Sequence, residues 1–219
     1  MGYIAELNTS MHYPIQLTDT GYGLSLLLPV PGQVRSVYET LYADDPSTPF
    51  PFWAKIWSAS YALSDFLKSE PELVQGKQLL EIGAGIGLPS FIIANTARKV
   101  IISDHAPEAV KLMEENIRLL GVGNATAFLL DWNHIPENIS ADIILLSDVN
   151  YAPDQFDPLL KMIHYFLQQD SLVILATPQR ITASPFALAL QPFIRRTLIQ
   201  PIMDSGTETD IAILLLQQE

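Results

Sequence analysis

The chain has 219 residues, of which 48% are apolar, with no cysteine and a formal net charge of −12. This length and composition allow one domain with a sizeable core, and the lack of cysteine excludes disulfides and thiolate metal sites. Because a negative surface repels phosphate backbones, we expect no nucleic-acid partner. A small amine or a basic protein would suit the charge, although an acidity that only maintains solubility explains it equally well.

We expect a cytoplasmic protein with no membrane partner. The first residues, MGYIAELNTS, contain neither the basic segment nor the apolar run of a signal peptide. The densest apolar run, GLSLLLPVPG, is too short to span a bilayer and is interrupted by prolines. We also expect a monomer, because no long exposed apolar stripe stands out in the pattern.

The first 50 residues differ in pattern from the rest. Two short extended runs flank Gly21 and Gly23, which predicts a β-hairpin. Residues 43–51, ADDPSTPFP, are rich in turn formers and are predicted to be a loop. We therefore expect residues 1–50 to form an extension of hairpin and loop, and residues 51–219 to form a single compact domain.

From residue 51 onward, helical and strand patterns alternate. Apolar residues at helical spacing predict helices at 52–69, 88–95, 107–121, 154–169 and 184–190. Short apolar runs predict strands at 78–82, 99–104, 125–132, 141–148, 171–177, 193–200 and 210–217. Most of these runs are apolar throughout, which is typical of strands buried on both faces. The prediction is an α/β fold: a Rossmann-like, seven-stranded, mostly parallel sheet with helices on both faces and a final antiparallel hairpin.

A glycine-rich loop, EIGAGIG, follows the first predicted strand of this domain. Glycine allows a sharp turn and a close approach of a ligand to the backbone, and the following helix directs free N–H groups toward the same place. The dinucleotide fingerprint G-x-G-x-x-G fits poorly, because Leu88 stands at its last glycine position when counting begins at Gly83. The spacing is instead acid-x-G-x-G-x-G, beginning at Glu81. A tight strand–helix turn that binds nothing is the alternative.

The next two strands end in residues that suit an adenosine. Asp104 ends the second strand, and a carboxylate there can accept hydrogen bonds from both ribose hydroxyls. Asp131 and Trp132 end the third strand, where an acid can accept from an adenine amino group and an indole can cover the ring. Each feature alone has a structural alternative: a helix N-terminal acid in the first case, and a surface acid beside a half-buried tryptophan in the second.

With these motifs the chain resembles a class I S-adenosylmethionine-dependent methyltransferase. Two further stretches resemble the seven-strand protein-lysine methyltransferase group, which is also described as nicotinamide N-methyltransferase-like. They are PFWAKIWSAS, which contains Trp57, and SDVNY, which contains Asp148 and Tyr151. The resemblance covers roughly residues 51–180, and Asn150 departs from it because the group is usually apolar at that position.

The resemblance implies S-adenosylmethionine as the cofactor. The implied binding residues are Trp57, Glu81, Gly83, Ala84, Gly85, Asp104, Asp131, Trp132 and Ser147. The glycines would lie beneath the methionine part of the cofactor, the acid after the second strand would hold the ribose, and the Asp-Trp pair would bracket adenine. Trp57 would close over the cofactor, and Ser147 would sit near the methyl group.

The resemblance also places two residues at the reaction site, Asp148 and Tyr151. A carboxylate raises the pKa of a nearby amine, so Asp148 would not activate it. We expect Asp148 to orient the amine and Tyr151 to narrow the channel by stacking on the cation. The alternative is that Asp148 caps the following loop and Tyr151 belongs to the core. Arg180 has either a place near the substrate mouth or a surface role.

The function implied by the resemblance is N-methylation, with a lysine amine of a protein as the acceptor. A small-molecule N-methyltransferase of the nicotinamide type and a non-catalytic S-adenosylmethionine-binding interaction domain are the alternatives. The protein-lysine and the small-molecule functions differ in whether the N-terminal 50 residues leave the channel open to a polypeptide or close it as a lid. The histidines are scattered without ligand spacing, so we expect no metal. The lack of a Pro-Pro-aromatic stretch after the fourth strand argues against DNA methylation.

Overall fold

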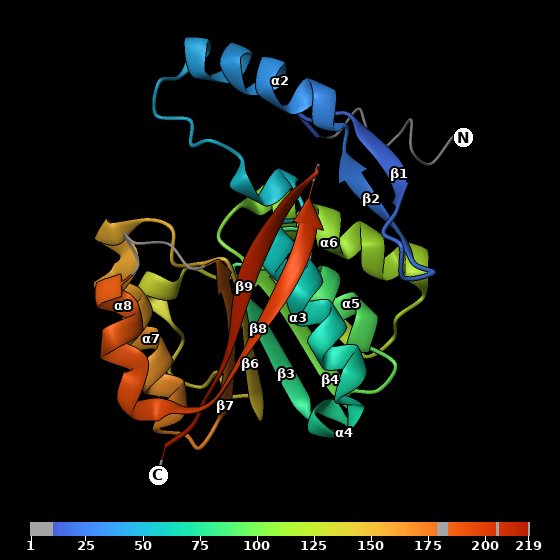
Figure 1. Cartoon of the computed structure of the whole chain (residues 1–219). Helices are drawn as coiled ribbons and strands as arrows, with labels where there is room; N and C mark the ends of the chain where they lie inside the picture. Colours follow the sequence, from blue (N-terminus) through green and yellow to red (C-terminus); the bar gives the residue numbers. More distant parts are fainter. Residues whose placement is uncertain (1–10, 179–183, 205, 219) are drawn as a thin grey trace.

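The computed structural model describes residues 11–178, 184–204 and 206–218. Its main sheet has seven strands in the order β5-β4-β3-β6-β7-β9-β8 (Figure 1). The first five strands in this order pair in parallel, whereas β9 is antiparallel to both β7 and β8. The strands are β3 (Gln78–Ile82), β4 (Lys99–Asp104), β5 (Ala125–Leu129), β6 (Ile143–Ser147), β7 (Leu172–Pro178), β8 (Ile194–Asp204) and β9 (Thr207–Leu216). The predicted fold class is confirmed, including the final antiparallel hairpin.

Helices cover both faces of this sheet (Figure 1). One face packs against α3 (Ser58–Ser69), α5 (Leu88–Ile93) and α6 (Pro107–Leu120), and the other against α7 (Phe156–Leu167) and α8 (Ser184–Leu190); α4 (Pro71–Val74) is a single turn after α3. Because side chains alternate along a strand, Leu79 enters the first core and Leu80 the second. Among the described residues, no helix is long and apolar enough to cross a membrane.

The predicted N-terminal hairpin is also present. Strand β1 (Ile15–Asp19) pairs antiparallel with β2 (Ser25–Pro29), and the turn between them contains Gly21 and Gly23. Leu27 binds the side chain of Asn116 on α6 through both of its backbone groups. Its N–H donates to Asn116 Oδ1 over 2.7 Å, and its carbonyl accepts from Asn116 Nδ2 over 3.1 Å. The buried leucines of β2 join the core beneath α6, so the hairpin packs on the main domain.

Helix α2 (Pro31–Asp44) follows the hairpin and was not predicted from the sequence. It begins with Pro31 in its first turn, where a missing N–H costs nothing, and it ends where the Asp45 N–H donates to the Leu41 carbonyl. No residue of α2 is buried, which explains why its sequence lacks the strong apolar stripe of a core helix. In Figure 1 it lies at one end of the molecule, in blue.

Two predicted element boundaries differ from the structure. The predicted helix over residues 52–69 is divided into the 3₁₀ turn η1 (Phe52–Ala54) and α3, and Trp57 precedes α3 in an extended conformation. Strand β8 continues to Asp204 and β9 begins at Thr207, so the pairing extends beyond the predicted strand ends at residues 200 and 210. Both differences place side chains at the end of the domain where the parallel strands finish.

Candidate active site

A cavity of about 500 Å³ lies at the carboxyl ends of the parallel strands. Strand order reverses there, because β4 lies on one side of β3 and β6 on the other. Ligands of open α/β sheets bind at such a switch point. Nine of the eleven predicted site residues line the cavity: Trp57, Gly83, Ala84, Gly85, Asp104, Trp132, Ser147, Asp148 and Tyr151.

The glycine loop forms one wall of the cavity and needs glycine at Gly83 and Gly85 as well as at Gly87. Gly83 and Gly85 have φ values of +66° and +57°, which place both in the left-handed region. A Cβ on Gly83 would lie 3.0 Å from Trp132 Cζ3 and 3.1 Å from Val149 Cγ1. A Cβ on Gly85 would lie 3.2 Å from the carbonyl oxygen of Trp53. Any larger residue would therefore be strained and would crowd the space between the loop and the cavity walls.

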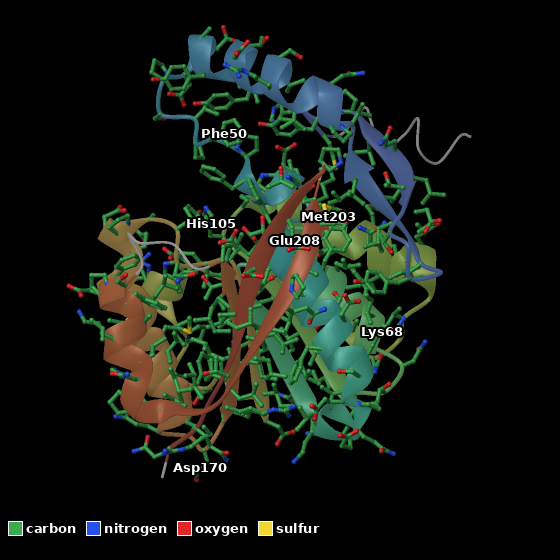
Figure 2. The ribbon with its side chains drawn as sticks, in the orientation of Figure 1. Phe50, Lys68, His105, Asp170, Met203 and Glu208 are labelled. Carbon is green, nitrogen blue, oxygen red and sulfur yellow. The ribbon has the colours of Figure 1, made fainter. Side chains whose placement is uncertain are left out.

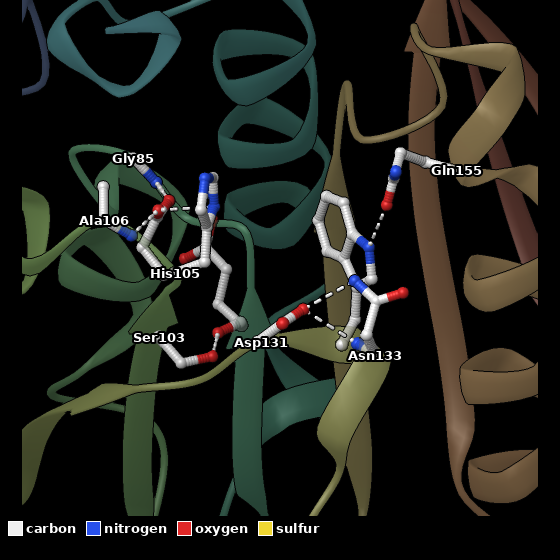
Figure 3. A network of polar contacts seen from close by, with 10 residues as sticks. Gly85, Ser103, His105, Ala106, Asp131, Asn133 and Gln155 are labelled. Atoms are coloured by element: carbon white, nitrogen blue, oxygen red, sulfur yellow. Dashed lines mark hydrogen bonds and ion pairs between the residues drawn. The ribbon is translucent and has the colours of Figure 1, made fainter. Parts of the chain in front are cut away.

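Asp104 ends β4, is 4% exposed and joins the glycine loop to the start of α6. Its Oδ2 accepts from the Gly85 N–H over 2.9 Å, and its Oδ1 accepts from the Ala106 N–H over 2.9 Å (Figure 3). His105 Nδ1 lies 3.3 Å from the same Oδ1, and this hydrogen bond raises the pKa of His105. These three contacts use about three of the roughly four acceptor sites of the carboxylate, so Oδ2 can still accept from one ligand hydroxyl.

Trp132 lines the cavity beside Gly83 and is held in place by a hydrogen bond. Its Nε1 donates to Gln155 Oε1 over 3.1 Å, as the dashed line to Gln155 in Figure 3 shows. Gln155 belongs to the 3₁₀ turn η3 (Pro153–Gln155), which follows the segment that carries Asp148 and Tyr151. The indole therefore has a fixed orientation, as a flat wall for an aromatic ligand requires.

Asp131 is exposed and does not line the cavity. Its carboxylate accepts from the backbone and side chain of Asn133 over 2.9 and 2.7 Å, and lies 3.2 Å from His134 Nδ1. Its limited burial opposes ionisation, but these hydrogen bonds prevail and hold the pKa of Asp131 below its ordinary value. They organise the 3₁₀ turn η2 (Trp132–His134) and use much of the acceptor capacity that an adenine amino group would need.

Glu81 is fully buried on β3 and also lies outside the cavity lining. Its Oε2 accepts from the N–H and the hydroxyl of Ser90, over 3.2 and 2.5 Å, which ties β3 to α5 behind the glycine loop. Its Oε1 has no hydrogen-bond partner among the described residues. Burial raises the pKa of Glu81 to about 7, so this carboxyl group is partly protonated at neutral pH.

The opposite side of the cavity contains the residues predicted for the reaction. Ser147, at the end of β6, is bridged to Ser60 of α3 by a hydrogen bond of 2.9 Å between the two hydroxyls. Asp148 follows with φ of +56°, a conformation that non-glycine residues rarely adopt. Tyr151 is 39% exposed, which excludes the alternative that it belongs to the core. Asn150 is buried and accepts from Thr177 Oγ1 over 2.7 Å, so it does not line the cavity.

A smaller side pocket of about 90 Å³ adjoins the cavity here. Its lining consists of Phe52, Trp57, Asp148 and Tyr151, all of which also line the larger cavity. Trp57 Nε1 donates to the Phe52 carbonyl over 2.8 Å, which fixes the indole relative to η1. Burial, together with the charges of nearby carboxylates that include Asp148, raises the pKa of Tyr151. Three aromatic rings and one carboxylate thus line the side pocket.

The part of the cavity that comes from the N-terminal segment was not predicted from the sequence. These residues are His12, Tyr13, Leu41, Thr48, Pro49, Phe50 and Pro51. His12 is held by its backbone N–H, which donates to Glu108 Oε1 over 2.8 Å. The aromatic run PFPFW at residues 49–53 was the available signal, because such a run at the start of a domain rarely faces solvent without a reason. Phe50 and Phe52 stay 42% and 44% exposed, so the mouth of the cavity is open.

The cavity residues fit S-adenosylmethionine. A glycine floor without side chains lets a ligand approach the backbone closely, Asp104 can accept from a ribose hydroxyl, and Trp132 offers a flat face for a purine. No group of three or more His, Cys, Asp or Glu side chains within the described ranges is arranged to hold a metal ion. Arg180 lies outside the described residues.

The chain is similar in sequence to known protein methyltransferases. A sequence model described as lysine methyltransferase matches residues 52–189. The mouse histone-arginine methyltransferase METTL23 is 26% identical over 166 residues, which cover 73% of this chain and 65% of the mouse protein. The Xenopus tropicalis protein N-lysine methyltransferase METTL21A is 27% identical, with 75% and 78% covered. The Arabidopsis thaliana calmodulin-lysine N-methyltransferase is 32% identical, with 51% and 40% covered.

Solved structures show the same fold at lower identity. The N-methyltransferase NodS from Bradyrhizobium japonicum, in complex with S-adenosyl-L-homocysteine, is 13% identical with a TM-score of 0.60, and the match covers 83% of this chain and 98% of that one. An rRNA methylase from Streptococcus thermophilus is 15% identical with a TM-score of 0.55, over 75% and 100% of the two chains. The chain spans less than two thirds of the mouse and Arabidopsis relatives. The chain belongs to the lysine methyltransferase family, whose methyl donor is S-adenosylmethionine.

Proposed function

We propose that the protein transfers the methyl group of S-adenosylmethionine to a lysine amine of another protein. The observation that carries the proposal is the side pocket of about 90 Å³ next to the larger cavity, with its lining of three aromatic rings and one carboxylate. Its three rings, from Phe52, Trp57 and Tyr151, suit the methylene chain and the cationic head of a lysine, and Asp148 suits its charge.

When bound, S-adenosylmethionine supplies a methyl group that its positive sulfur already activates. The protein residues therefore need to orient the acceptor nitrogen and exclude water from it, and no strong base is required. A lysine amine has a pKa of about 10.4 in water, and Asp148 raises it further. Asp148 thus binds and orients the ammonium ion. The aromatic rings have the opposite effect on the pKa of the amine, because desolvation of the charge lowers it. The open mouth gives the released proton a route to solvent.

The open mouth favours a polypeptide over a small molecule. Residues from α2 and the following loop line the cavity without covering it, since Phe50 and Phe52 are each more than two-fifths exposed. A lid over a small acceptor would bury these rings. The non-catalytic alternative is disfavoured because the glycine loop, Asp104 and the side pocket are all present with competent residues.

Methylation of arginine is the second candidate, and it rests on the comparison with METTL23, whose name states histone-arginine methylation. A guanidinium group is planar and binds carboxylates through two parallel hydrogen bonds. Asp148 is the single carboxylate that lines the side pocket. One carboxylate accepts both of these hydrogen bonds, so Asp148 suits either acceptor, and the preference for lysine rests on the match to the lysine methyltransferase family.

The test is a methyl-transfer assay with tritiated S-adenosylmethionine and a lysate from cells that lack the protein. Protein and small-molecule fractions are separated, and the labelled protein is hydrolysed so that methyllysine and methylarginine can be resolved. We expect label in protein as methyllysine, and none with the matched Asp104→Ala variant. Label in the small-molecule fraction or in methylarginine would overturn the proposed acceptor.

A further inference from the structure

A continuous line of aromatic rings leads from α2 to the side pocket. The rings belong to Tyr42, Tyr38, Phe50, Phe52 and Tyr151, and we call them the aromatic track. The successive centroid distances along it are 5.6, 5.0, 4.9 and 5.1 Å. Figure 2 shows Phe50 on the segment that connects α2 to the rest of the domain. The track therefore joins a peripheral helix to the residues proposed to hold the acceptor.

The aromatic track is exposed although its rings touch one another. Tyr42 is 46% exposed, and the exposed fractions of Phe50, Phe52 and Tyr151 lie between 39% and 44%. Helix α2 has no buried residue, so these rings do not serve a core. An aromatic surface of this extent beside a cavity is typical of a binding site for a partner.

The charges around the aromatic track favour a cationic partner. At one end, α2 and the residue after it contain Glu39, Asp44 and Asp45. The single basic residue of α2, Arg35, is already bonded to Glu39 over 2.9 Å. At the other end the side pocket contains Asp148. Together with a net charge of −12, this distribution attracts basic segments and repels acidic ones.

We propose that the aromatic track binds an extended, Lys/Arg-rich segment of the substrate protein directly next to the lysine that enters the side pocket. This inference rests on the proposed function and specifies its substrate class. Arginine and lysine side chains stack on aromatic faces, which matches a line of rings about 5 Å apart. An extended chain rises ~3.3 Å per residue, so no more than about six residues are needed to follow the track.

The experiment measures binding of a fluorescein-labelled synthetic peptide by anisotropy, with S-adenosyl-L-homocysteine present. The peptide has about 13 residues, with one central lysine and alternating arginine and serine on both sides. A matched peptide carries glutamate in place of arginine. The double variant Tyr38→Ala/Tyr42→Ala removes two rings that do not line the cavity, and Tyr38→Phe/Tyr42→Phe keeps them. Phe50→Leu tests the middle of the track and leaves α2 unchanged.

We expect the wild-type protein to bind the arginine peptide at least about tenfold more tightly than the glutamate peptide. The double alanine variant and Phe50→Leu should each raise Kd about fivefold or more, whereas the double phenylalanine variant should stay within about twofold. Titration with S-adenosylmethionine should give the same Kd for the wild-type protein and both double variants. Circular dichroism checks that α2 is retained.

Each of the following binding or sedimentation results would overturn the inference: no binding of the arginine peptide, equal binding of the glutamate peptide, an unchanged Kd in the double alanine variant, or a dimer in sedimentation that the double alanine variant abolishes. The last would assign the track to a second copy of the chain. Peptide binding that depends on the track without methyl transfer to any acceptor would keep this inference and contradict the proposed function. Methyl transfer at a rate that does not change when the rings are removed would support the proposed function and contradict this inference.

Discussion

The two walls of the cavity are built in opposite ways. The cofactor wall, formed by the glycine loop, Asp104 and Trp132, is a network of short hydrogen bonds between buried or half-buried groups. The other wall, which we call the acceptor wall after its proposed role, consists mostly of exposed rings in contact with one another. Its residues are Phe50, Phe52, Trp57, Asp148 and Tyr151. A rigid polar wall suits one constant ligand, whereas an open aromatic wall suits the varied surface of a protein substrate.

The largest effect is expected when the cofactor wall is broken at Asp104. Asp104→Ala removes the acceptor for the Gly85 and Ala106 N–H groups as well as the acceptors for a ribose. Hydrogen bonds to a charged group are worth ~1.5–3 kcal/mol each, so the affinity for S-adenosylmethionine should fall about 100-fold. Isothermal titration calorimetry measures this change. A loss of less than about threefold would show that the carboxylate is not part of the cofactor site.

A smaller effect, confined to the acceptor wall, is expected at Asp148. Asparagine adopts the left-handed conformation more readily than most residues, so Asp148→Asn removes the charge with little change to the backbone at φ of +56°. The rate of methyl transfer should fall about tenfold, or ~1.4 kcal/mol, because the acceptor amine is less well oriented. Calorimetry should give an S-adenosylmethionine Kd within about twofold of the wild type. A variant that lost cofactor affinity and kept its rate would contradict the separation of the two walls.

The glycine loop and the acids at the strand ends could be predicted because each depends only on residues that are adjacent in the sequence. A left-handed turn requires glycine, and a strand end places its last side chain at the sheet edge. Glu81 belongs to the same motif, yet alternation along β3 directs it toward Ser90 of α5 and away from the cavity. Asp131 is adjacent to a cavity residue, but its carboxylate serves the turn that follows it.

The acceptor wall could be predicted only in part, because its members meet through tertiary contacts. Tyr38 and Phe50 are 12 positions apart, and Phe52 and Tyr151 are 99 apart, yet each pair is in ring contact. Helix α2 lacks the apolar stripe that core packing imposes on other helices, so no periodicity indicated it. The position of α2 depends on contacts with residues from other parts of the chain, and no single segment of the sequence specifies these contacts.

An effect on stability is expected at Glu81, behind the cofactor wall. Its pKa is raised to about 7 in the folded chain, so between about pH 4.5 and 7 the unfolded chain loses this proton first. The free energy of unfolding therefore falls as pH rises through this window and levels off above it. The melting temperature of Glu81→Gln minus that of the wild type should increase by about 5 °C from pH 5 to pH 7.5. A constant difference between the two melting curves over this range would contradict the assignment.

The smallest effect is expected at Asp131, the predicted adenine residue that does not line the cavity. Its carboxylate is exposed and already accepts from Asn133 and His134. Asp131→Asn keeps an oxygen acceptor and should change the affinity for S-adenosylmethionine by no more than about threefold. Calorimetry in parallel with Asp104→Ala gives the comparison. A loss comparable to that of Asp104→Ala would mean that Asp131 turns toward the adenine when the cofactor binds.

The central claim, that the cavity at the strand switch point is an S-adenosylmethionine site, is tested most directly by calorimetric titration of the purified protein. S-adenosylmethionine and NADH are titrated side by side, because both contain an adenosine and only the first contains the methionine part. The account predicts micromolar binding of S-adenosylmethionine and none of NADH. If S-adenosylmethionine does not bind, the proposed enzyme function fails, and the glycine loop serves only as a turn between β3 and α5.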